Sequence, residues 1–423
     1  MDTTAYPTTV YVLGTERNIG KTVTSIGIIS TLLAPEHGYC IDDIGYIKPV
    51  GQQTVKVPGR DGATLDIDKD AVLLTTLLGV HCDDYAALSP VVWRGGTTAT
   101  LIEQAAGGDA AQPREQMLER IRAGYRTVAA GRRIVIAEGT GQPGVGSVSG
   151  ISNADVIGAL RAMGVPVFVV LVAPGGIGST IDQIFPYLMT LDHVGCRLDG
   201  LIINGVYPLK MDKIRGYLET YYGRVFPQLY GRYLTRQGAP PILGFVPTVD
   251  ELRLPSMRFV AEALAEESDT KVEIVVPDSL EHACDPIRNL KVISLDFGYE
   301  PYLRPGDAVV VGVNANETIS NTVRLHQRLL RERGAGLAGL ILSCATVGGL
   351  AQQTYELLRA EGLPTILLQQ DSAEIVQRIE GITVKIQPYD TAKRELIARA
   401  YREHLTLWPE LRDAPRPGVL YPQ

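Results

Sequence analysis

One segment near the N-terminus constrains the fold more than any other. The apolar run TVYVLG leads into the loop GTERNIGKT, residues 14–22, and the amphipathic stretch TVTSIGIISTLLA follows. A strand, a glycine-rich loop, Lys-Thr and a helix in this order direct backbone N–H groups and a helix N-terminus at one point, which suits a polyphosphate. The segment therefore predicts a phosphate-binding loop (P-loop) at the carboxyl edge of a sheet.

Within this loop, Lys21 is expected to contact the β and γ phosphates of ATP, and Thr22 to coordinate Mg²⁺. Five residues separate Gly14 from Gly20, rather than the four of the general pattern. A glycine turn that merely caps a helix is the other interpretation, but GKT directly after a strand favours the nucleotide site. The residues expected to contact the nucleotide here are Gly14, Thr15, Asn18, Ile19, Gly20, Lys21, Thr22 and Val23.

Apolar runs alternate with longer amphipathic stretches along most of the chain. The first series includes IGYIKPV, RRIVIAEG, VPVFVVLVAP and LDGLIING, and a second series begins with VEIVVP after the polar segment AEESDTK. Near-continuous apolar strands between helices are typical of a parallel sheet covered on both faces. We predict an α/β fold: a P-loop-containing, doubly wound, mostly parallel sheet over residues 1–265 and a smaller α/β domain over 271–406. Residues 407–423 are proline-rich and are expected to form an extended tail.

Composition argues against several classes of protein. Hydrophobic residues make up 45% of the chain, the net charge is −7, and Lys and Arg form no stripe, so nucleic acid is not an expected partner. The start has no cationic segment before an apolar one and no apolar run reaches the length of a membrane span, which predicts a cytoplasmic protein. Five cysteines without a CxxC pair indicate neither a disulfide framework nor a zinc knuckle.

Five further segments, together with the loop spacing, resemble dethiobiotin synthetases. They are IGYIKPVGQQT (44–54), DIDKDAVLL (66–74), RRIVIAEG with its glutamate at 138, and LIINGVYP followed by GFVPTVDEL (244–252). The resemblance covers roughly residues 8–262 and identifies the region as a member of the cobyrinic acid a,c-diamide synthetase and dethiobiotin synthetase superfamily. It implies that Lys48 lies beside the substrate and the γ-phosphate, and that Asp70 and Glu138 join Thr22 as the metal site. It also implies that Asn204 reads the adenine edge and that Pro247 lines the base pocket.

Some of these residues have simpler explanations. Asp70 follows Asp66 and Asp68, and it could cap a helix from a solvated loop. Asn204 precedes a glycine after a strand, which is also ordinary turn chemistry. The GTGQPG segment after Glu138 satisfies GxGxxG, but its loop continues through VGSVSG before a helix begins, so we do not predict a dinucleotide site there.

The second half carries a different resemblance. Residues 362–397 are similar to the second half of a DRTGG domain, and VNANET (313–318) stands where the family's signature turn would lie. A dethiobiotin-synthetase-like domain followed by such a domain is similar to the N-terminal part of long phosphotransacetylases.

These observations favour an enzyme that uses Mg-ATP to phosphorylate a carboxylate or carbamate of an unidentified small molecule. The alternative is a nucleotide-sensing regulatory module with slow or incidental hydrolysis. A substrate pocket walled by residues 89–107 and 139–150 would favour the enzyme. A partition-type ATPase is disfavoured, because TERNI (15–19) lacks the additional lysine of that class. The resemblance to dethiobiotin synthetases also implies a homodimer.

Overall fold

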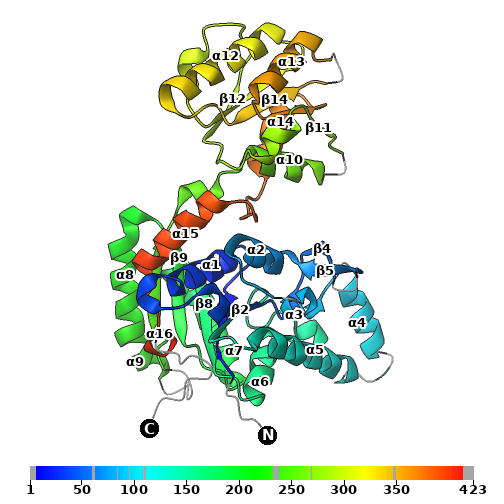
Figure 1. The fold of residues 1–423 in the computed structure, drawn as a ribbon. Coiled ribbons are helices and arrows are strands. Elements are labelled where there is room, and N and C mark those ends of the chain that lie inside the picture. The colour runs from blue at the N-terminus through cyan, green and yellow to red at the C-terminus, as the bar shows by residue number, and fades with distance from the viewer. Residues whose placement is uncertain are drawn as a thin grey trace. The chain divides into compact units, whose positions relative to one another are not determined.

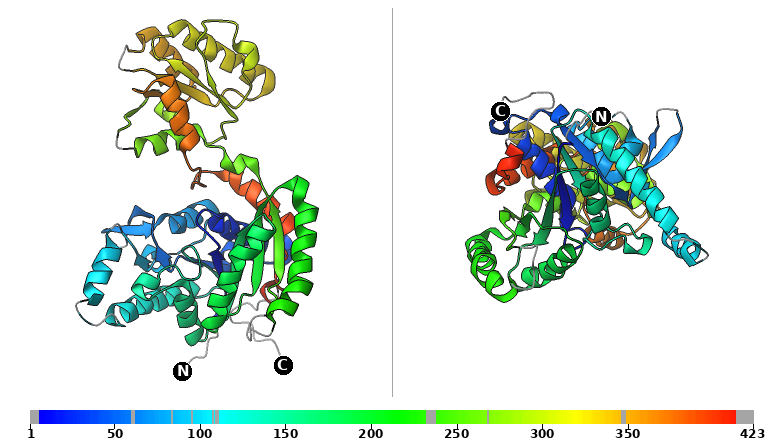
Figure 2. Two further views of the ribbon diagram at one scale, coloured as in Figure 1. Left: turned by 180° about the vertical axis from the view of Figure 1, so that it is seen from behind. Right: turned by 90° about the horizontal axis from the view of Figure 1, so that it is seen from below.

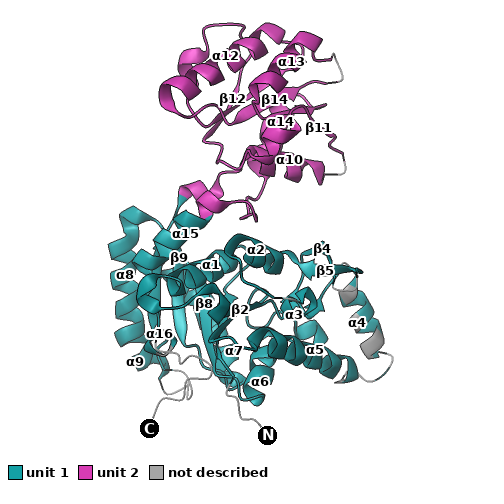
Figure 3. Cartoon of the chain, viewed as in Figure 1, with its two compact units in different colours: residues 1–249, 394–423 teal, residues 250–393 magenta. Residues whose placement is uncertain are grey.

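The computed structural model describes residues 6–412, except 60–61, 83, 95, 107, 109–110, 232–237, 268 and 346–348. Figure 1 shows the course of the chain. It divides into two compact units, the first made of residues 1–249 and 394–423 and the second of residues 250–393 (Figure 3). The second unit is thus an insertion in the sequence of the first.

Six parallel strands form the central sheet of the first unit. Their order is β10 (Ile242–Pro247), β9 (Gly200–Val206), β8 (Val167–Pro174), β1 (Thr8–Gly14), β7 (Ile134–Glu138) and β2 (Ile44–Ile47). The sheet is parallel throughout, and most of its strand residues are buried, which confirms the predicted doubly wound architecture.

The strand order reverses beside β1. Helix α1 (Lys21–Leu32) leads from β1 toward β2 on one side of the sheet, whereas α7 (Gly178–His193) leads from β8 to β9 on the other. In open α/β sheets, ligands bind at the carboxyl ends of the strands at such a switch point. The P-loop follows β1 directly, so the topology places the predicted nucleotide site there.

The remaining elements of the first unit surround this sheet. An antiparallel hairpin of β4 (Thr54–Pro58) and β5 (Thr64–Asp68) precedes α2 (Lys69–Leu78), and β3 (Val50–Gly51) pairs with β6 (Val91–Val92). The helices are α3 (Tyr85–Leu88), α4 (Thr97–Ala106), α5 (Ala111–Ala129), α6 (Asn153–Ala162), α8 (Met211–Thr220), α9 (Phe226–Tyr230), α15 (Thr391–His404, from residue 394 in this unit) and α16 (Pro409–Arg412).

The second unit is a smaller α/β structure, as predicted. Its sheet has the order β11 (Val272–Ile274), β15 (Thr365–Leu368), β14 (Gly339–Ser343), β13 (Asp307–Gly312) and β12 (Asn289–Val292), and only β11 is antiparallel to its neighbour. Val309 and Val311 face α12 (Asn316–Arg333) and α13 (Gln352–Glu361). Ala308 and Val310 face α10 (Met257–Ala265), α11 (Pro277–Glu281) and α14 (Ser372–Gly381), so apolar clusters cover both sides of the sheet.

The boundaries of the two units differ from those of the predicted domains, 1–265 and 271–406. Helix α10 packs Met257, Val260 and Leu264 into the core of the second unit, so the polar segment AEESDTK is a connection inside that unit. Conversely, residues from 394 onward belong to the first unit. The predicted tail begins with an ordered helix, α16, where Leu411 is fully buried; its residues 413–423 lie outside the described part of the chain.

Helix α15 packs directly on the helix that follows the P-loop. The hydroxyls of Tyr401 and Thr24 lie 2.7 Å apart, and the Tyr401 ring occupies the space where a Cβ on Gly27 would be. Figure 2 shows the red end of α15 beside the blue α1. Beyond α15, Trp408 donates from its indole nitrogen to Asp199 O at 3.1 Å. The segment from α15 to Leu411 is therefore an integral part of the first unit.

No helix in the described part of the chain combines the length and apolar character that crossing a bilayer requires.

We expect Gly27→Ala to lower the free energy of unfolding of the first unit by about 1–3 kcal/mol, because the added methyl group overpacks the Tyr401 contact. Urea unfolding measures the change. Gly158→Ala is the matched control, since Gly158 is also helical but has open space around it, and alanine there should be neutral or slightly stabilising. Equal effects of both substitutions would contradict the tight packing of α15 on α1.

Candidate functional site

The P-loop joins the end of β1 to the start of α1. Gly20 has φ +95° and Asn18 has φ +58°, both in the left-handed region that glycine and asparagine tolerate best. A Cβ on Gly20 would also collide with the side-chain amide of Asn204. The first four N–H groups of a helix have no acceptor within it, so those of residues 20–23 are suited to bind an anion.

The start of the loop is held by the protein itself. The N–H of Gly14 donates to Gly141 O at 3.1 Å, and that of Thr15 donates to Val172 O at 3.0 Å. The Thr15 hydroxyl donates to Gln183 at 3.2 Å, while Tyr187 donates to Thr15 O at 2.9 Å. In this structure Gly14 and Thr15 therefore shape the loop, and the available amides lie further along it.

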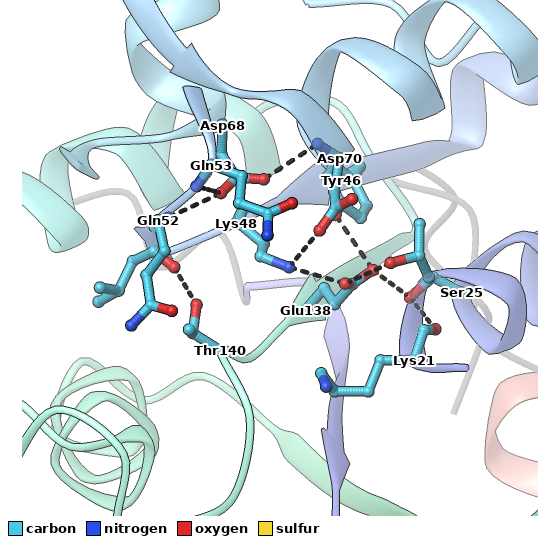
Figure 4. A network of polar contacts seen from close by, with 12 residues as sticks. Lys21, Ser25, Tyr46, Lys48, Gln52, Gln53, Asp68, Asp70, Glu138 and Thr140 are labelled. Carbon is cyan, nitrogen blue, oxygen red and sulfur yellow. Dashed lines mark hydrogen bonds and ion pairs between the residues drawn. The ribbon is translucent and has the colours of Figure 1, made fainter. Parts of the chain in front are cut away.

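Glu138 lies at the end of β7, next to β1, and has no exposed surface. Its carboxylate accepts hydrogen bonds from Thr22 at 3.0 Å, Ser25 at 2.9 Å, Tyr46 at 3.2 Å and Lys48 at 2.7 Å (Figure 4). Each carboxylate oxygen accepts two of these bonds. The predicted strand-end glutamate thus connects the P-loop helix to β2.

Lys48 is 4% exposed and lies between two carboxylates, with its Nζ 2.8 Å from Asp70 and 2.7 Å from Glu138. Burial alone would lower the pKa of Lys48, but the charges of Asp70 and Glu138 outweigh it and raise the pKa above its usual value. For Lys21, burial is the larger effect and lowers the pKa, although Glu138 opposes it. Lys48 is therefore a firmly charged internal cation.

The three alternating aspartates have separate partners. Asp68 caps α2 by accepting from Asp70 N at 3.0 Å, and it also accepts from Gln52 N at 2.8 Å. Burial raises the pKa of Asp68, although the charge of Lys48 opposes this. Asp66 instead forms an ion pair with Arg94. The capping role considered for Asp70 therefore belongs to Asp68, which leaves the Asp70 side chain directed at Lys48.

These oxygen donors fit a magnesium ion. Within the described residues, no group of three or more His, Cys, Asp or Glu side chains converges. The candidate ligands are the Thr22 hydroxyl and the carboxylates of Asp70 and Glu138, since Lys48 donates to both carboxylates and Thr22 donates to Glu138. Mg²⁺ commonly takes one or two carboxylates and keeps several waters. Asp70 is partly exposed, whereas both oxygens of Glu138 are already hydrogen-bonded. Asp70 and Thr22 are thus the more accessible donors.

The two residues predicted to contact the adenine base, Asn204 and Pro247, lie near the carboxyl ends of β9 and β10. Asn204 on β9 donates from its amide to Ile19 O of the P-loop at 2.9 Å. Pro247 ends β10, the neighbouring strand. Beside it, the Thr248 hydroxyl is buried without a hydrogen-bond partner in the described part of the chain.

Sequence reasoning missed several residues that support the site. Ser25 lies three residues after Thr22 in α1 and Tyr46 lies two residues before Lys48, spacings that bring side chains to one face of a helix and of a strand. Those spacings could have identified both residues. Gln183 and Tyr187 could not be identified in this way, because they lie 168 and 172 residues in sequence from the P-loop residue that they contact, and only the folding of the chain brings α7 to the loop.

The glycine-rich segment after Glu138 does not open a helix. It continues to Gly150 before α6 begins at Asn153, in agreement with the long loop predicted from the sequence. The Asn153 amide donates to Thr140 O at 3.0 Å and to Gln142 O at 2.6 Å. Residues 139–142 are therefore fixed against α6.

Comparison with known proteins gives one family match. The profile of a family described as AAA domain (AAA_26) matches residues 8–256, which is more than half of the chain. No curated protein gives a significant match.

Three solved structures show distant likeness to the chain. The CBS and DRTGG domains of the regulatory region of Clostridium perfringens pyrophosphatase, complexed with the activator diadenosine tetraphosphate, are 15% identical, with a TM-score of 0.23 and coverage of 31% of this chain and 46% of that one. The present chain thus spans about half the length of that relative. The Aquifex aeolicus MinC:MinD cell division complex is 12% identical (TM-score 0.29; 58% and 83% covered). The signal recognition particle receptor FtsY from Elizabethkingia anophelis with GDP is 13% identical (TM-score 0.28; 59% of each chain covered).

We expect Lys48→Met to lower the free energy of unfolding by about 3–5 kcal/mol in the absence of nucleotide, because it leaves two neighbouring carboxylates without their shared cation. Urea unfolding measures this loss. Adding Glu138→Gln to Lys48→Met should restore part of the stability, since one of the two stranded charges is then removed. A loss below about 1 kcal/mol for Lys48→Met would argue against the buried ion pairs.

Proposed function

The chain belongs to the AAA-domain family matched by residues 8–256, and on that premise we propose that it is a Mg-ATP-dependent enzyme of the ligase type. It transfers the γ-phosphoryl group of ATP to a carboxylate or carbamate, and an amine then attacks the resulting mixed anhydride and releases phosphate. The observation that carries this proposal is the buried, charged Lys48 beside the hydroxyl and amides of the P-loop.

Lys48 suits this chemistry because its charge is fixed in place. Phosphoryl transfer needs positioned positive charge around the transferred group more than it needs covalent catalysis. Glu138 holds both Lys48 and Thr22, so one buried carboxylate sets the position of a lysine from one segment and a P-loop hydroxyl from another. An acceptor carboxylate would approach Lys48 from the phosphate side.

The P-loop supplies the rest of the proposed phosphate site. The N–H groups of residues 20–23 bind the β and γ phosphates, and Lys21 neutralises charge on the transferred group. Mg²⁺, held by Thr22 and Asp70 with Glu138 behind them, would add Lewis-acid stabilisation of the phosphate oxygens. Asn204 and Pro247 line the base, and the Thr248 hydroxyl, buried without a described partner, is placed to hydrogen-bond the nucleoside.

A nucleotide-sensing module is the second candidate, and one observation favours it. The second unit is inserted between β10 and α15, and α15 packs on the P-loop helix through Tyr401. Ligand binding in an inserted domain would therefore act on the nucleotide site through the chain itself. An activity dependent on an acceptor substrate separates the enzyme from this alternative.

We expect Lys21→Ala to abolish the stabilisation of the protein by Mg-ATP, because Lys21 contacts the phosphates in the proposed complex. Thermal unfolding with and without Mg-ATP measures the shift. The matched control is Lys213→Ala, an exposed lysine in α8, which should keep the full ATP-dependent shift. Unchanged stabilisation in Lys21→Ala would rule out the P-loop as the nucleotide site.

The proposed reaction predicts that an acceptor stimulates phosphate release. We would measure steady-state phosphate release from Mg-ATP with and without 7,8-diaminononanoate plus bicarbonate, the acceptor pair that the resemblance to dethiobiotin synthetases suggests. Stimulation that is lost in Lys48→Gln but kept in the exposed variant Lys213→Gln would support ligase chemistry. Tight ATP binding without stimulation by this pair, or by a panel of other carboxylates with amines, would favour the sensing module.

A further inference from the structure

A cavity of about 410 Å³ lies in the first unit, away from the P-loop amides. Strand β5 forms one wall, and the segment from α3 through β6 forms another, with α5 closing one side. The residues that line it are Thr64, Leu65, Asp66, Ile67, Ala86, Ser89, Pro90, Val92, Arg94 and Arg120. The wall predicted from residues 89–107 is thus partly present, but β5 stands opposite it rather than residues 139–150.

The lining of this cavity has an apolar part and a cationic part. Leu65, Ile67, Pro90 and Val92 supply aliphatic surface, and the buried hydroxyl of Ser89 accepts from Asp68 N at 3.4 Å. The volume is within the usual range of small-molecule sites, which combine apolar walls with a few polar groups.

The charged residues of the lining are Asp66, Arg94 and Arg120. Arg94 forms an ion pair with Asp66, and Lys56 lies directly across the β4–β5 hairpin from Asp66. Arg120 makes no ion pair or hydrogen bond within the described part of the chain, although it lines the same cavity. A guanidinium is the side chain best matched to a carboxylate, because its N–H groups can donate to both oxygens.

We propose that this cavity binds a small monocarboxylate with an aliphatic body. The carboxylate would lie at Arg120, and the aliphatic part would lie against Leu65, Pro90 and Val92. This site is defined by its own lining residues and goes beyond the proposed phosphoryl transfer at the P-loop, so it stands or falls independently of that reaction.

The test uses the full chain and hexanoate as the probe, with affinity measured by ligand-observed NMR titration. We expect saturable binding that Arg120→Gln weakens by about tenfold or more, since a hydrogen bond to a charged group is typically worth about 1.5–3 kcal/mol. Ala86→Phe, which places a ring in the cavity, should also abolish binding. Arg126→Gln is the matched control, because Arg126 lies on the same helix but pairs with Glu119, and it should bind hexanoate normally.

Two further measurements distinguish binding in this cavity from binding at the P-loop and from nonspecific binding. Lys21→Ala should retain hexanoate binding while losing ATP, which distinguishes a failure of this proposal from a failure of the proposed function. Hexylamine, with the same body and the opposite charge, should not compete. Equal affinity in wild type, Arg120→Gln and Ala86→Phe would overturn the proposal, and so would displacement of hexanoate by an equal concentration of inorganic phosphate.

Discussion

A carboxylate without exposed surface must be matched by donors inside the protein, and Glu138 is the group around which this site is built. Two of its donors, Thr22 and Ser25, come from the P-loop helix, whereas Tyr46 and Lys48 come from β2 and the residue that follows it. Glu138 itself ends β7, which lies between β1 and β2. One buried charge therefore fixes the P-loop helix against two strands that are distant in sequence.

The sheet and this cluster could be predicted because both follow from local patterns. Near-continuous apolar runs specified buried parallel strands, and a glutamate at the end of such a run had to lie at the carboxyl edge of the sheet. It could not be predicted that Asp68 caps α2 while Asp70 pairs with Lys48. This arrangement depends on the β4–β5 hairpin, which ends at Asp68 and brings the backbone amide of Gln52 to its carboxylate.

The boundaries of the two units could not be predicted from the sequence either, because they depend on contacts between distant segments. A polar segment such as AEESDTK breaks an apolar pattern whether it joins two domains or two elements of one domain. Helix α15 has an amphipathic pattern, but that pattern does not say which partner covers its apolar face. The deciding contact joins Thr24 and Tyr401, 377 residues apart, and requires Gly27 to leave room for the ring.

The two points at which the second unit joins the first bear on both proposed functions, the enzyme and the nucleotide sensor. The second unit begins at residue 250, three residues after Pro247 at the end of β10, and the chain returns to the first unit at 394, within α15. Its two links therefore end at the proposed base site and at the helix packed on α1. Displacement of these links by a ligand of the second unit would be the route by which the proposed sensing module acts on the nucleotide site.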